Sequence, residues 1–324
     1  MAAHARACPY RLRRTRRWAC FTRVRVAPLL AALLSFHVHA TDPLLRARLH
    51  AEARLGAAVI PYSSSTRFDA SDALALLDAV PGNTNLVRLV YGTATLPTSS
   101  FSATTGWNRE HLWPNSYGLD DVEPSFSDLH NLRACDANVN SARGNKWYDL
   151  SSAAEGGIRA PAHVEAPECT ADANSWQPPA AQRGDIARAL FYMAVRYEGD
   201  VPGEPDLELV EDVGRISATA TVMGRLSTLL NWNREDPPDD DERKRDVAVR
   251  GIQGNSNPFV AEPGLANVLW LPTIDALQTP GGPIFVVEPT DLPVAVEYAL
   301  EPAGPWLEQR PPGDTALFAR VRLR

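Results

Sequence analysis

The stretch GWNREHLWPNSYG, residues 106–118, places a carboxylate and an imidazole side by side at Glu110 and His111. An imidazole whose pKa is near neutrality can take a proton from an attacking water. A second polar segment, SDLHNLRACDANVNSARGNKWYD at residues 127–149, places Asn140 and Arg143 three positions apart. An amide oxygen can bind a hard cation, and a guanidinium can hold a phosphate. The alternative is structural: Asn140 satisfies buried backbone groups, and Arg143 pairs with an acid.

The absence of several motifs from the sequence excludes the enzyme classes that need them. Four histidines follow residue 40, and no two have the i, i+4 spacing of a zinc-protease helix. The chain has neither a CxxC pair for structural zinc nor a GxSxG motif for a serine hydrolase. The pair Glu110 and His111 and the second polar segment therefore remain as the candidate site.

The sequence also predicts some of the helices and strands that position these residues. Asp136 is suited to cap a helix of about two turns that ends near Gly144, and Asn140 and Arg143 would share one face of it. Glu110 and His111 would point to opposite faces of a regular strand. Both can serve one site only if the strand ends or bends there, and Pro114 is consistent with such an exit.

Elsewhere, the patterns predict helices at 44–56, at 183–199 and at 216–232, and a strand at 85–92. The acidic run at 234–246 reads as a surface loop that leads into a charged helix, followed by a polar turn at 252–260. LQTPGGP, residues 277–283, has the composition of a linker. The runs IFVVEP, VAVEYALEP and ALFARVRLR after it predict a small β-rich appendage.

Residues 1–40 have the pattern of a secretory signal: eight arginines, then the apolar run at 26–38, then Val38-His39-Ala40. The apolar run is too short for a membrane span, so we expect cleavage after Ala40, a secreted or periplasmic protein, and no membrane anchor. Removing the eight arginines leaves 24 basic and 39 acidic residues, a net charge near −15. Because that charge is unusual for a nucleic-acid binder, any phosphate contact must come from a local basic patch.

Two cysteines, Cys135 and Cys169, remain after the predicted cleavage. In an oxidising compartment they suggest one disulfide, and the alternative is two buried thiols.

Taken together, WNREH-WP, SDLHNLR, VN and SARGN resemble the endonuclease I family of secreted or periplasmic nonspecific nucleases. RGDIARALFYMAVRY, LLNWNREDP and QGNSNPFV are similar to the same family, so the resemblance covers roughly residues 60–270. It implies an α+β fold with a ββα-metal (His-Me finger) core in a helix-rich domain. We expect domains at 1–40 (signal), 41–272 (nuclease) and 273–324 (linker and β-rich module).

The resemblance also implies residue roles. His111 would be the general base, while Glu110 and Asn140 would bind one Mg²⁺, for which Mn²⁺ can substitute. The products would carry 5′-phosphate and 3′-hydroxyl ends, and the substrate would be DNA and possibly RNA without sequence specificity. We expect a monomer. The alternatives are a phosphodiesterase with another substrate, and a catalytically silent extracellular binding or adhesion protein on the same scaffold.

Other residues have weaker assignments. Arg143 could hold the phosphate, and Arg109 and Arg133 could supply positive charge to the nucleic acid or have surface roles. His130 and Asn131 would support the site from behind, although His130 is equally a candidate core histidine. Asp128 could support His111 or cap a turn. Trp107 and Trp113 are more suited to core packing than to stacking on bases.

Overall fold

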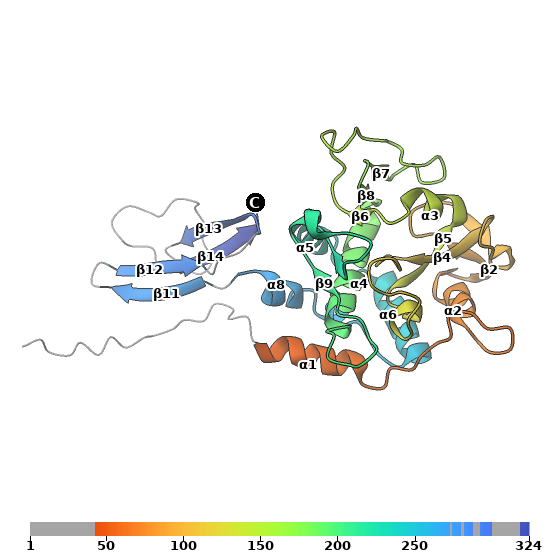
Figure 1. Cartoon of the computed structure of the whole chain (residues 1–324), viewed down its shortest axis with the longest axis horizontal. Coiled ribbons are helices and arrows are strands. Elements are labelled where there is room, and N and C mark those ends of the chain that lie inside the picture. Colours follow the sequence, from red (N-terminus) through yellow and green to blue (C-terminus); the bar gives the residue numbers. More distant parts are fainter. Residues whose placement is uncertain (1–42, 273, 280–281, 288–291, 300–317, 324) are drawn as a thin grey trace, which may run out of the picture. The chain divides into compact units, whose positions relative to one another are not determined.

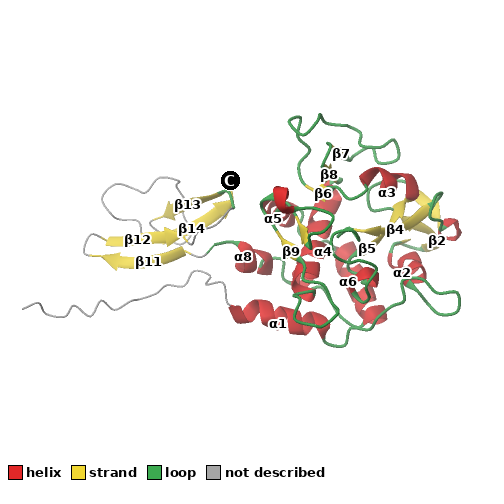
Figure 2. Ribbon diagram, in the orientation of Figure 1, coloured by secondary structure: helices red, strands yellow, loops and turns green. Residues whose placement is uncertain are grey.

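The computed structural model describes residues 43–272, 274–279, 282–287, 292–299 and 318–323. The predicted signal segment therefore lies outside the described residues. Within 43–272, helices alternate with small sheets, which is the α+β class (Figures 1 and 2). No helix in the described ranges is long and apolar enough to cross a membrane.

The centre of this part is a strand–strand–helix unit. Strand β4 (Trp107–His111) pairs antiparallel with β5 (Leu132–Asp136), and α3 (Ala137–Arg143) follows β5 without a break. The predicted cap is confirmed, because Asp136 accepts hydrogen bonds from the backbone N–H groups of Asn138 and Val139. A helix of seven residues is too short to be stable alone, so α3 depends on its packing against β4 and β5 (Figure 1).

Helix α4 (Arg183–Arg196) confirms the helix predicted at 183–199, and it lies almost entirely inside the protein. It packs against α1 (Pro43–Arg54) and α5 (Leu226–Glu235). The predicted helix at 216–232 is wrong in its first half. There β10 (Val222–Met223) pairs parallel with β9 (Glu208–Leu209), and α5 begins only at Leu226. The sequence TATV at 219–222 explains the difference, because its β-branched residues favour extended backbone.

Two hydrophobic clusters hold the strand–strand–helix unit. The larger one surrounds α4 and contains Trp113, and the smaller one contains Trp107 together with α2 (Ala70–Leu77) and Val249 of α6 (Asp240–Gln253). Both tryptophans are at most 1% exposed, which confirms the prediction that they are core residues. The other elements of this part are β1 (Ala79–Val80), β2 (Asn83–Arg88), β3 (Thr95–Pro97), β6 (Trp147–Tyr148), β7 (Thr170–Ala171), β8 (Ser175–Gln177), α7 (Pro258–Ala261) and α8 (Leu265–Trp270).

The C-terminal strands form two antiparallel pairs. Strand β11 (Ile274–Thr279) pairs with β12 (Gly282–Val287), and β13 (Val294–Ala299) pairs with β14 (Phe318–Leu323). The three predicted strands are present. LQTPGGP is not a linker, however, because it joins β11 to β12 as a hairpin whose last pair is Thr279 with Gly282. Its Pro-Gly-Gly sequence is turn chemistry of the kind that closes a hairpin.

Candidate active site

Glu110 lies at the buried end of β4 and is only 2% exposed. Its Oε1 accepts hydrogen bonds from the Tyr91 hydroxyl at 2.7 Å and from Arg143 at 3.1 Å. Burial raises the pKa of Glu110, while the Arg143 charge and the Tyr91 hydrogen bond oppose that shift. Both contacts use Oε1, which leaves Oε2 available to a further partner.

The Asn140 side chain is held in one orientation. Its Nδ2 donates to Asn108 Oδ1 at 2.8 Å and to the backbone oxygen of Arg109 at 3.1 Å. Because a backbone carbonyl only accepts, the amide nitrogen must face Arg109, and a flipped amide would place oxygen against oxygen. The Asn140 Oδ1 is therefore free to bind something else.

These two residues fit a divalent cation. A free carboxylate oxygen and a free amide oxygen are hard ligands of the kind that Mg²⁺ prefers. Within the described ranges, no cluster of three or more His, Cys, Asp or Glu side chains could hold a metal. A site built on Glu110 and Asn140 would thus supply two protein ligands and leave the other positions to water and substrate, which is common for Mg²⁺.

His111 is the last residue of β4. The strand therefore ends at the position where Glu110 and His111 could serve one site. The imidazole stacks on Phe126, with ring centroids 4.9 Å apart, and on Tyr62 at 5.5 Å. Its Nε2 lies 2.8 Å from the backbone oxygen of Phe126. Since that oxygen only accepts, Nε2 carries the proton in the neutral ring, and Nδ1 keeps a lone pair. The side chain of His111 thus has different partners from that of Glu110, and Nδ1 can accept a proton.

We expect the pH dependence of kcat/KM to reflect the burial of His111. Burial lowers the pKa of His111 to about 4, against a weaker opposing effect of the Phe126 carbonyl, and Arg109 and Arg143 lower it further. Only the neutral ring can act as a base, so kcat/KM should rise with pH through the acid range and be nearly flat from about pH 6 to 8. A pH–rate profile on one fixed substrate measures this. An acid limb centred near 6.5, the ordinary value for histidine, would contradict the structure.

Arg143 is buried at 2% exposure, and its two terminal nitrogens are occupied. Besides Glu110, it donates to the backbone oxygens of His111 and Leu112, both at 2.9 Å, and it lies over the Tyr148 ring at 4.7 Å. This corrects its assignment as a phosphate contact. Arg143 ties the end of β4 to α3 and orients Glu110, so we treat it as a positioning residue.

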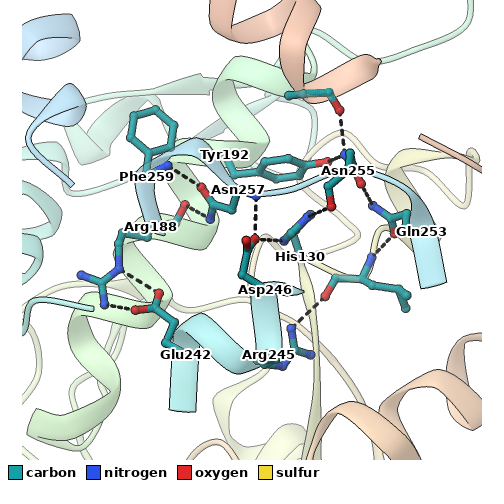
Figure 3. A network of polar contacts seen from close by, with 12 residues as sticks. His130, Arg188, Tyr192, Glu242, Arg245, Asp246, Gln253, Asn255, Asn257 and Phe259 are labelled. Carbon is teal, nitrogen blue, oxygen red and sulfur yellow. Dashed lines mark hydrogen bonds and ion pairs between the residues drawn. The ribbon is translucent and has the colours of Figure 1, made fainter. Parts of the chain in front are cut away.

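His130 belongs to a different buried network, which is shown in Figure 3, and Asp128 contacts members of the same network. The His130 ring packs on Tyr192, and its Nε2 lies 3.3 Å from the backbone oxygen of Asn255. Asp128 accepts hydrogen bonds from the hydroxyls of Tyr192 and Tyr197 and from the backbone of His130. Neither side chain contacts His111. His130 is therefore a histidine of the core, and Asp128 caps a turn through the backbone N–H of His130.

Asn131 lies close to the end of β4. Its Oδ1 accepts from the backbone N–H of Trp113 at 2.7 Å, and its Nδ2 donates to the backbone oxygen of Trp113 at 3.2 Å. These bonds fix the chain two residues after His111.

The two other candidate arginines differ from each other. Arg109 is partly exposed, lies over the Tyr62 ring at 3.7 Å and donates to the Tyr62 backbone oxygen, and its role as a nucleic-acid contact stays a prediction. Arg133 is only 9% exposed and donates to the backbone oxygens of His130 and Leu132. This corrects its assignment as a nucleic-acid contact, because its charge is used inside the protein.

The predicted disulfide is absent. Cys135 and Cys169 are both free, buried thiols. The Cys169 sulfur donates a weak hydrogen bond to the backbone oxygen of Tyr91 at 3.5 Å, and burial raises the pKa of both thiols. The prediction of a bond between them is therefore corrected in favour of the buried-thiol alternative.

Several residues of the site come from other parts of the chain and were not predicted from the sequence. They are Tyr62 and Phe126 around His111, Tyr91 and Tyr148 around Glu110 and Arg143, and Asn108 beside Asn140. Of these, only Asn108 could have been predicted from the sequence. It lies two residues before Glu110 in WNREH, and residues two apart in a strand point to the same face.

Comparison with known proteins supports the assignment of the fold. The family model described as Endonuclease I matches residues 58–264, which include every element of the site. The chain belongs to the endonuclease I family. It is 42% identical over 202 residues to the extracellular ribonuclease of Bacillus amyloliquefaciens and, to the same extent, to that of Bacillus subtilis (strain 168). Each alignment covers 61% of this chain and 66% of the relative, so the chain spans just under two thirds of those proteins.

Proposed function

We propose that this protein is an exported, divalent-metal-dependent nuclease that hydrolyses phosphodiester bonds of RNA and DNA without sequence specificity. The supporting observation is the pair of free oxygens on Glu110 and Asn140 beside a histidine whose Nδ1 is free. Two relatives that are named extracellular ribonucleases favour RNA as a substrate and an extracellular location.

In this proposal His111 takes the proton of a water through Nδ1. The water oxygen attacks phosphorus, the bond from phosphorus to O3′ breaks, and the leaving oxygen takes a proton from solvent. Glu110 and Asn140 would hold Mg²⁺, or Mn²⁺ in its place, and this ion would offset the negative charge that develops on the phosphate and the leaving oxygen. The backbone oxygen of Phe126 keeps the proton on Nε2 and so leaves Nδ1 as the basic nitrogen.

Analysis of the product ends tests this chemistry. The purified protein should degrade both RNA and plasmid DNA to fragments with 5′-phosphate and 3′-hydroxyl ends. Fragments with 2′,3′-cyclic phosphate ends would show that the RNA 2′-hydroxyl is the nucleophile, and His111 would then not act by activating a water. Intact RNA and plasmid would exclude the nuclease.

A further inference from the structure

A polar groove begins where α3 ends. Its volume is about 370 Å³, and its walls come from the last turn of α3, the turn into β6 and the loop at 173–174. The groove is open to solvent, so an occupant such as one nucleotide of a longer chain would stay exposed on one side. The residues important for its chemistry are Ser141, Arg143, Asn145, Lys146, Trp147 and Asn174.

The groove lies next to the candidate active site and shares one lining residue with it, Arg143. Arg143 lines it and also donates to Glu110 at 3.1 Å, and Ser141 directly follows Asn140. Nε of Arg143 is buried and has no hydrogen-bond partner among the described residues. The guanidinium is paired with Glu110, so the cation that the groove itself offers to a phosphate is Lys146. A chain whose phosphate is bound at Glu110 and Asn140 would have its next nucleotide near this opening.

The side chains in the groove have the chemistry of a single-strand binding site. Trp147 is half-buried: its side chain packs against the larger hydrophobic cluster, and its backbone N–H donates to the Asn174 oxygen at 3.2 Å. Lys146 donates from Nζ to the Ala173 oxygen, and burial together with the nearby Arg159 charge lowers its pKa. An aromatic side chain beside a cation and amide groups is the usual arrangement for stacking a base and contacting its phosphate.

We propose that this groove binds one nucleotide of the substrate next to the scissile phosphate, with the base on Trp147 and a phosphate near Lys146. The inference rests on the proposed nuclease function. It assigns to Trp147 and Lys146 a role in substrate binding that does not involve the chemical step.

A series of oligoribonucleotides of about two to six nucleotides tests the stacking. For the wild-type protein, kcat/KM should rise steeply at the length that first fills the groove. Trp147→Leu should remove that rise, a loss on the order of tenfold on the longer substrates, and leave the shortest nearly unaffected. Trp147→Phe should keep most of the rise, because it keeps a flat ring. A variant that is merely unstable would lose activity equally at every length.

The salt dependence of binding tests Lys146. Binding of a six-nucleotide RNA to the wild-type protein and to Lys146→Gln is measured in EDTA, which prevents cleavage. The plot of log K against log salt should be shallower for the variant, its negative slope being smaller in magnitude by about 0.7. Lys244→Gln is the matched control, since Lys244 is 75% exposed on α6 and should leave the slope unchanged.

The outcomes separate this inference from the proposed function. If the wild-type protein cleaves RNA but Trp147→Leu shows the same length dependence as the wild type, or Lys146→Gln the same salt slope, the groove is not a nucleotide subsite. If the wild-type protein cleaves no oligonucleotide of any length, the proposed function itself is wrong.

Discussion

His111→Ala should lower kcat for RNA cleavage by about 10²–10⁴-fold, the usual contribution of a general base. The substitution removes the imidazole that lies next to the candidate metal ligand Glu110. Its Nε2 is held by the Phe126 oxygen, and its Nδ1 is free to take a proton. Single-turnover cleavage of a labelled RNA measures the effect on the chemical step. Because the variant also loses the stacking of the imidazole on Phe126 and Tyr62, its unfolding temperature is measured as well, and activity is compared well below it.

His163→Ala is the matched control for this variant. His163 is a partly exposed histidine that pairs with Glu165, and it contacts neither Glu110 nor Asn140 in the described structure. It should retain wild-type activity. If a well-folded His111→Ala protein cleaved RNA at the wild-type rate, His111 would not be the base.

Arg143→Met should destabilise the protein by about 3–5 kcal/mol at neutral pH. The variant keeps much of the side-chain volume but leaves the Glu110 carboxylate buried without its ion-pair partner, and it removes the bonds to the His111 and Leu112 oxygens. The loss should be smaller at acidic pH, because Glu110 can then take a proton and become neutral. Urea unfolding at about pH 5 and pH 8, in EDTA, measures both effects.

Arg234→Met tests whether this loss comes from burial. Arg234 is 56% exposed and its ion pair with Glu235 lies on the surface, so the variant should cost less than about 1 kcal/mol. Adding Glu110→Gln to Arg143→Met should recover part of the lost stability, since no charge is then left unpaired. An equal loss for Arg143→Met and Arg234→Met would contradict the role of Arg143 as a buried clamp.

The sequence indicates the proposed centre of the site because the candidate residues are close together along the chain. Glu110 and His111 are neighbours, and Asn140 lies on a short helix with recognisable cap residues. The strand–strand–helix unit follows from the family resemblance, and the end of β4 at His111 follows from the opposite directions of adjacent strand side chains.

The sequence predicts burial and distant partners poorly. Arg143 looks like a phosphate contact until the fold surrounds it with Glu110 and two backbone oxygens. Tyr91 lies 19 residues before Glu110, and no local pattern connects them. The segment at 216–225 shows the same limit, because its partner β9 lies in another part of the chain.

RNA cleavage with and without EDTA is the most direct test of the proposed site. We expect excess EDTA to abolish cleavage by the wild-type protein and Mg²⁺ or Mn²⁺ added above the chelator to restore it. Asn140→Ala should then need at least about tenfold more Mg²⁺ for half-maximal activity, as expected when one of two protein ligands is lost. Undiminished cleavage in EDTA, or the same Mg²⁺ requirement in Asn140→Ala as in the wild type, would contradict a metal site at Glu110 and Asn140.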